Sequence, residues 1–93
     1  MKQLLLDGNA LQSREQLHTW TAQELHLPAY YGRNLDALYD CLCEQSEPVL
    51  IRVQNTAALQ ENLGRYARAL LHMLAAAAEQ NPQITVECED NEP

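Results

Sequence analysis

The sequence is poor in aromatic residues and in basic residues. It contains no Phe and a single Trp, and its six Lys and Arg are outnumbered by thirteen Asp and Glu, which gives a formal net charge of −7. A chain this acidic is repelled by nucleic acid and by anionic membranes. We therefore expect neither of these as a partner, and expect a basic protein instead.

Cysteines and long apolar runs are also scarce. The odd number of cysteines (Cys41, Cys43 and Cys88) does not suit a disulfide framework and favours reduced thiols in the cytoplasm. No apolar run approaches the ~20 residues that cross a bilayer. The N-terminal stretch MKQLLLDG is too short for a signal peptide. These absences predict a cytoplasmic protein that does not associate with membranes.

What is present is enough for one small domain. The chain has 93 residues, of which 46% are hydrophobic, and a chain of this length forms one domain with a modest core. We assign residues 1–88 to that domain and residues 89–93 to an acidic C-terminal tail.

The hydrophobic pattern predicts strands that alternate with pairs of helices. The strands cover residues 2–6, 48–53 and 83–88, and the helices cover residues 13–26, 35–45, 56–63 and 65–80. Because helices connect successive strands, we expect an α/β fold with a small three-stranded parallel sheet, right-handed crossovers and about four packed helices. An antiparallel α+β arrangement is the alternative.

Short polar residues mark the predicted helix starts. Ser13 and Gln16 have the spacing of a capping box. Asn34 and Asn55 are natural N-caps for the helices that follow them. In the loop between the first two helices, Gly32 is the residue expected to take a positive φ.

The helix predicted over residues 35–45 has one apolar and one acidic face. At about 100° per residue, its three leucines fall on one side and its acids form a row on the other. The acids are Asp36, Asp40 and Glu44. Like charges at this spacing cost about 0.2–0.5 kcal/mol per pair. The row is either a solvated face or a surface for a basic partner, and the adjacent tyrosines Tyr30 and Tyr31 favour an interface.

The segment LPAYYGRNLDALYDCL, residues 27–42, resembles the corresponding segment of the barstar family of intracellular inhibitors of barnase-like ribonucleases. The similarity extends over nearly the whole chain, with DG after the first strand, LH in the first helix and ITV in the last strand in similar order. The resemblance implies the same small parallel α/β fold. It also implies a protein that is not an enzyme and needs no cofactor.

In that family the loop and the helix after it enter the active-site cleft of a small basic ribonuclease. The resemblance therefore implies a one-to-one complex in which Asp40 occupies the phosphate site and Asp36 meets a second basic group. It also implies an immunity protein or antitoxin that mimics RNA phosphate charge and is a monomer when free. The implied contact residues are Tyr30, Gly32, Asn34, Leu35, Asp36, Ala37, Tyr39 and Asp40, with Glu44, Met73 and Glu79 as a possible flank.

The chain departs from the family pattern at the edge of this surface. Tyr39 stands where the family has Trp, and Ala76 stands where the family has an acid, with Glu79 one turn further on. The loop after Leu42 is one residue shorter. We therefore expect a related nuclease or toxin ribonuclease domain, rather than barnase itself, as the partner.

Other functions remain as alternatives. A non-inhibitory adaptor for a basic protein is favoured by Ala76 and the shorter loop, and opposed by Tyr30 together with the two aspartates. Asp36 and Asp40 could also be a catalytic acid–base pair, but the sequence has no pocket-forming residues around them. Cys41-x-Cys43 lacks zinc-ligand spacing, so we expect no metal.

Overall fold

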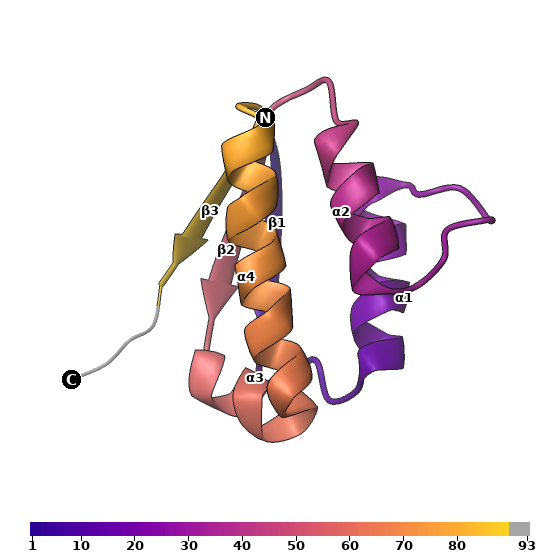
Figure 1. Ribbon diagram of the computed structural model, residues 1–93. Coiled ribbons are helices and arrows are strands. Elements are labelled where there is room, and N and C mark those ends of the chain that lie inside the picture. Colours follow the sequence, from indigo (N-terminus) through magenta and orange to yellow (C-terminus); the bar gives the residue numbers. More distant parts are fainter. Residues whose placement is uncertain (90–93) are drawn as a thin grey trace.

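Three strands and four helices alternate along the chain in the predicted order (Figure 1). The structure is a computed structural model that describes residues 1–89. The elements are β1 (Lys2–Asp7), α1 (Arg14–Leu25), α2 (Leu35–Cys43), β2 (Val49–Gln54), α3 (Thr56–Leu63), α4 (Arg65–Gln80) and β3 (Ile84–Cys88). Residues 90–93 of the predicted acidic tail lie outside the described residues.

The three strands form one parallel sheet in the order β1-β2-β3. In its register, Leu4 pairs with Ile51, and Ile51 pairs with Val86. The predicted α/β fold with a three-stranded parallel sheet is therefore confirmed. The antiparallel α+β alternative is wrong.

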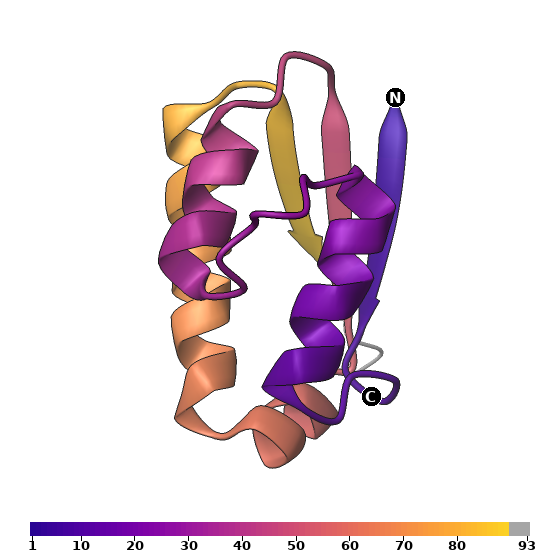
Figure 2. The same cartoon turned by 90° about the vertical axis from the view of Figure 1, so that its right-hand side faces the viewer.

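The helices α1, α2 and α4 lie on one face of the sheet (Figures 1 and 2). This follows from topology, because right-handed crossovers between strands placed in chain order return on the same side. Burial alternates accordingly in β1, where Leu4 and Leu6 are buried while Leu5 on the other face is 46% exposed. Along residues 1–89, no helix has the length and apolarity that a bilayer crossing requires.

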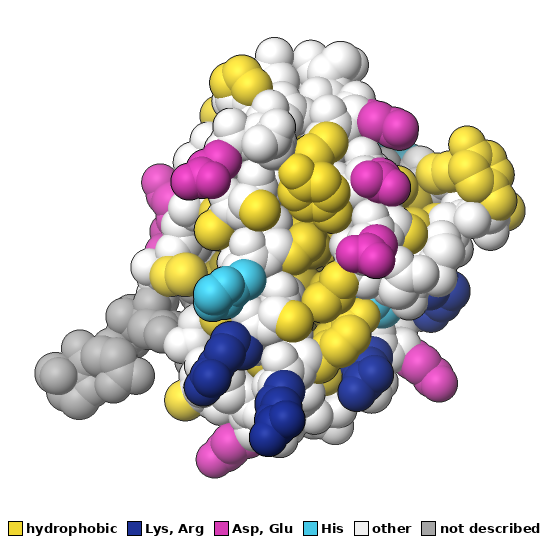
Figure 3. All heavy atoms as spheres, in the orientation of Figure 1, with side chains coloured by type: hydrophobic (Ala, Val, Ile, Leu, Met, Phe, Trp, Pro, Cys, Tyr) yellow, Lys and Arg dark blue, Asp and Glu magenta, His cyan; other side chains and the backbone are white. Residues whose placement is uncertain are grey.

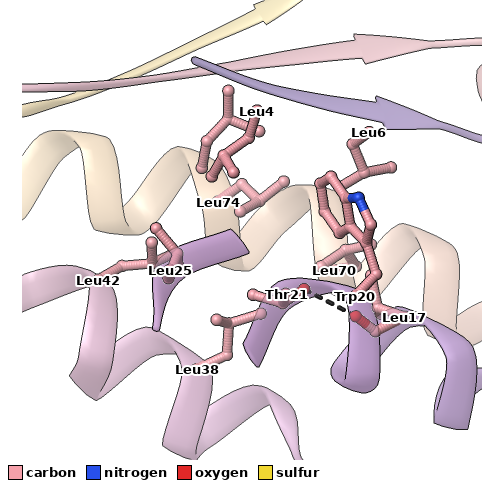
Figure 4. Close-up of a pocket in the computed structure, with 11 residues that line it drawn as sticks. Leu4, Leu6, Leu17, Trp20, Thr21, Leu25, Leu38, Leu42, Leu70 and Leu74 are labelled. Carbon is pink, nitrogen blue, oxygen red and sulfur yellow. Dashed lines mark hydrogen bonds between the residues drawn. The ribbon is translucent and has the colours of Figure 1, made fainter. Parts of the chain in front are cut away.

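Leucines fill the core, as expected of a sequence without Phe. At the junction of the three helices and β1 they enclose a cavity of about 10 Å³ (Figure 4). Thr21 lines this cavity, but its hydroxyl donates to the Leu17 carbonyl at 2.8 Å. The cavity has room for about one water, and apart from Thr21 and Trp20 its lining consists of leucines and Ile51, so it is a packing defect rather than a ligand site.

Two of the four helix starts have the predicted caps. Ser13 Oγ accepts from the Gln16 backbone N–H at 3.1 Å. Gln16 reaches back one residue further than predicted, because its Oε1 accepts from the Gln12 backbone N–H. Asn34 is described with the site below.

The expected cap at Asn55 does not form. Asn55 has φ 57° and makes no side-chain cap. Its Nδ2 instead donates to Asp7 Oδ1 at 2.8 Å, which joins the end of β1 to the start of α3. Gly8 lies at the same corner, where a Cβ would come within 2.1 Å of the Asn55 carbonyl oxygen. Only glycine allows this close approach.

Candidate functional site

The helix α2 begins with a complete N-cap. Asn34 has extended backbone angles, and its Oδ1 accepts from the Ala37 backbone N–H at 2.8 Å. Asp36 lies in the first turn, where a carboxylate is stabilised by the helix dipole. The cap therefore fixes where the helix starts and the direction in which its acids point.

The acid row of α2, defined as Asp36, Asp40 and Glu44, is exposed along its whole length. The buried side of the same helix carries Leu38 and Leu42, at 2% and 1% exposure. Figure 3 shows acidic side chains in a line over α2, beside an apolar strip between α2 and α4. The predicted division of this helix into two faces is confirmed.

The acid row has no cationic partner within residues 1–89. The ion pair in this part of the chain joins Arg52 and Glu89 at 2.8 Å, on the sheet. Glu89 was assigned to the tail from the sequence, but its backbone N–H also donates to Val53 O at 2.7 Å. The charge of the row is therefore not neutralised locally.

The carboxylates of the row contribute, as secondary causes, to the pKa shifts of two neighbouring side chains. Burial first, and then the carboxylates of Glu44 and Asp40, raise the pKa of the Cys41 thiol. A hydrogen bond with Cys43 is the largest cause that raises the pKa of Tyr39, and Asp40 adds to it. Both groups therefore stay neutral at pH 7, which leaves the row as the charged feature of this helix.

The loop between α1 and α2, residues 26–34, presents one tyrosine and buries the next. Tyr30 is 88% exposed, whereas Tyr31 is 8% exposed. The loop projects from the body of the protein beside α2 (Figures 1 and 3). The loop next to α2 therefore carries an exposed aromatic ring.

Buried contacts hold this loop to the helices. The Tyr31 hydroxyl lies 2.6 Å from His18 Nδ1, and the Tyr66 hydroxyl of α4 lies 2.6 Å from His18 Nε2. Burial raises the pKa of both tyrosines, and lowers the pKa of His18 with help from the Arg33 charge. Sequence reasoning missed this network. The local signal for it was the position of His18, which lies next to Leu17 and Thr21 on the face of α1 that packs against the core.

A strained arginine fastens the other end of the loop. Arg33 has φ 57°, and its Nη2 donates to Thr19 Oγ1 at 2.6 Å and to the Glu15 carbonyl at 3.2 Å. The positive φ expected at Gly32 is therefore found one residue later, because these side-chain bonds compensate for the strain. At Gly32 a Cβ would come within 3.2 Å of the Ala37 Cβ, a tight contact that a larger residue could form only if its neighbours moved slightly.

The remaining predicted contact residues lie on α2 and α4. Leu35, Ala37 and Tyr39 are half-buried on α2. Met73 is half-buried on α4, which packs against α2, and Glu79 is exposed near the end of α4. The structure thus places an acid row, an exposed tyrosine and an apolar strip on one side of the protein.

No metal-binding cluster of His, Cys, Asp or Glu occurs in the described part of the chain. The three cysteines are unpaired: Cys41 and Cys43 are half-buried, and Cys88 is exposed.

Comparison with known proteins identifies the family. The chain matches the family model described as "Barstar (barnase inhibitor)" over residues 1–90. It is also 36% identical over 81 residues to "Putative ribonuclease inhibitor YrdF" of Bacillus subtilis (strain 168), an alignment that covers 86% of this chain and 89% of that protein. Together with the parallel sheet and the capped acidic helix, these matches show that the chain belongs to the barstar family.

Proposed function

We propose that this protein inhibits a small basic ribonuclease by covering its active site in a one-to-one complex. The observation that carries the proposal is the acid row of α2, which is exposed and has no cationic partner within residues 1–89. Family membership and the name of the Bacillus subtilis relative support the same function. The inhibitor itself performs no catalysis.

The chemistry of RNA binding explains why such a row would bind the active site of a ribonuclease. A ribonuclease must concentrate positive charge to hold phosphate, and carboxylates at successive helical turns offer it complementary charge. An arginine can bind a carboxylate with two parallel hydrogen bonds. In our proposal Asp40 occupies the phosphate site, and Asp36 meets a neighbouring basic group.

The surroundings of the row supply the rest of the contact. Tyr30 is exposed and would pack against the catalytic region, since tyrosine combines apolar area with a hydroxyl. Gly32 and Asn34 contribute from the loop. Leu35, Ala37 and Tyr39 contribute from the helix, with Glu44, Met73 and Glu79 at the flank.

The biological role that fits this chemistry is that of an immunity protein or antitoxin. The negative charge of this protein would speed the capture of a basic nuclease, so that the nuclease is inhibited before it damages the producing cell. Tyr39 and Ala76, together with the shorter loop after Leu42, differ from the family pattern at the edge of the contact. We therefore propose a partner related to barnase, or a toxin ribonuclease domain, rather than barnase itself.

An inhibition assay tests the proposal. RNA cleavage by a panel of barnase-class ribonucleases, barnase included, is measured against increasing amounts of the protein. We expect at least one enzyme to lose its activity at an equimolar end point. Glu61→Ala, which removes an exposed acid on α3, serves as a control that should inhibit like the parent. Binding without loss of RNA cleavage would support the adaptor, and no inhibition across the panel would contradict the proposal.

A further inference from the structure

A buried polar cluster joins the loop of residues 26–34 to two helices. It consists of His18 on α1, Tyr31 in the loop and Tyr66 on α4, with both ring nitrogens of His18 at 2.6 Å from a tyrosine hydroxyl. His18 is 2% exposed. The core around this cluster is otherwise almost entirely aliphatic.

We propose that His18 and Tyr66 are positioning residues, which hold Tyr31 inside the protein so that Tyr30 and residues 32–34 keep the shape that the ribonuclease binds. The inference rests on the proposed function. His18 and Tyr66 would act at a distance, because neither side chain is among the residues proposed to touch the enzyme.

The geometry of the loop makes Tyr31 its inner anchor. Tyr30 and Tyr31 are consecutive, and their side chains point to opposite sides, one into solvent and one into the core. The Tyr31 backbone N–H donates to Pro28 O at 3.0 Å, which closes a turn around Tyr30. The position of the Tyr31 ring therefore sets the position of the exposed ring beside it.

Both nitrogens of His18 are needed for the cluster. A neutral imidazole has one N–H donor and one bare nitrogen acceptor. One tyrosine therefore accepts a hydrogen bond from the ring, and the other donates one to it. No buried side-chain nitrogen or oxygen within residues 1–89 lacks a partner, so the cluster is complete.

Stability alone does not explain such a cluster. Replacing both partners of a buried hydrogen bond by apolar groups of the same shape is close to neutral for stability. What a satisfied polar cluster adds is a single orientation of its members. A rigid loop also loses less conformational entropy on binding, and so binds more tightly.

Two substitutions at one position separate the two hydrogen bonds. The amide of His18→Asn lies near the position of Nδ1 and can keep the bond to Tyr31. The amide of His18→Gln lies near the position of Nε2 and keeps only the bond to Tyr66. Tyr31→Phe and Tyr66→Phe remove each hydroxyl and leave the ring in place. Val53→Ala, a core change in β2 away from the loop, controls for general destabilisation.

The first readout is hydrogen exchange of the backbone amides of residues 30–34 in the free protein. We expect His18→Gln and Tyr31→Phe to speed this exchange about tenfold, the equivalent of one lost hydrogen bond. We expect smaller changes, of no more than about threefold, for His18→Asn and Tyr66→Phe, because both remove the bond to Tyr66 and leave the bond to Tyr31. Val53→Ala should not speed hydrogen exchange in the loop more than it does in the rest of the protein.

The second readout is the inhibition constant against the ribonuclease panel, at a temperature where circular dichroism shows every variant folded. We expect the variants to rank in the same order, with the inhibition constant of His18→Gln about tenfold weaker than that of the parent. Parent-like inhibition by both His18→Gln and Tyr31→Phe would overturn the inference, as would an equal loss in Val53→Ala. If the parent inhibits no enzyme, the proposed function fails, whereas parent-like exchange in His18→Gln refutes the positioning role separately.

Discussion

Asp40 is the residue on which the proposed mechanism most depends. It lies in the middle of the acid row, one helical turn from Asp36 and one from Glu44, and the described part of the chain offers it no cation. The repulsion within the row costs the free protein a few tenths of a kcal/mol per pair. In a complex, the carboxylates of the row would form hydrogen bonds with basic side chains of the nuclease, and these bonds would offset the cost of the repulsion.

Asp40→Ala should therefore weaken binding more than any other single change in the row. Without the Asp40 carboxylate, basic side chains of the enzyme would be buried without a partner, which costs about 3–5 kcal/mol. Asp36→Ala should cost less, and Glu79→Ala little. Titration calorimetry with the inhibited ribonuclease measures the three changes, with Glu61→Ala as the control. Binding by Asp40→Ala that equals the parent's would show that the site is assigned wrongly.

His18 predicts a pH dependence of stability. Burial, with a contribution from the Arg33 charge, lowers the pKa of His18 in the folded protein. The unfolded chain then takes up a proton at a higher pH than the folded chain does, so the free energy of unfolding decreases as the pH falls below about 6.5. Urea denaturation across this range should show the decrease in the parent and a flatter profile in His18→Gln. Identical profiles would count against a neutral, buried His18.

The sequence predicted some of these residues and not others, for a physical reason. The acid row follows from helical periodicity, which a short segment contains in full. The contact between His18 and Tyr66 joins residues 48 positions apart and leaves no periodic signal. Tyr66 could be expected to lie against the core, but its hydroxyl partner depends on how α4 packs on α1.

At the scale of elements, the charges of α2 do not favour the stability of the helix itself. Its first turn has an acid, which suits the helix dipole, but no base stands in its last turn. Glu44 instead follows the helix as its C-cap, where the dipole disfavours a negative charge. A helix selected only for stability would carry Lys or Arg at this end.

Glu44→Lys should therefore stabilise the free protein and weaken the complex. Removing the repulsion with Asp40 and placing a cation at the helix C-terminus should add about 0.3–1 kcal/mol to the free energy of unfolding. The opposite charge should slow association with a basic enzyme. Urea denaturation and stopped-flow binding measure the two effects, with Glu44→Gln expected to lie between them. A variant that is less stable than the parent would contradict the electrostatic reasoning for this helix.

Element order and sheet direction were predictable because they depend on apolar periodicity and on helices between successive strands. The conformations of single loop residues were not. Arg33 takes the positive φ that Gly32 was expected to take, since Arg33 gains hydrogen bonds to Thr19 and Glu15. Asn55 likewise bonds to Asp7 instead of capping its helix. In both cases a contact that is distant in sequence overrides the local preference.

At the scale of the whole molecule, the net charge of −7 should govern the speed of encounter. Charges of opposite sign attract a basic enzyme over about 10 Å at moderate salt, and this attraction is screened as salt increases. Raising the salt concentration should therefore lower the association rate by about tenfold or more while changing the dissociation rate much less. Stopped-flow kinetics with the inhibited ribonuclease measures both rates. An association rate that is independent of salt would contradict electrostatic steering.

The most direct measurement is the structure of the complex with an inhibited ribonuclease. We predict that α2 lies in the active-site cleft, with the carboxylates of Asp36 and Asp40 within hydrogen-bonding distance of the basic side chains that hold RNA phosphate. We also predict that Tyr30 packs beside these side chains. A complex in which the acid row faces bulk water, and the catalytic groups of the nuclease stay open to substrate, would contradict the proposed mechanism.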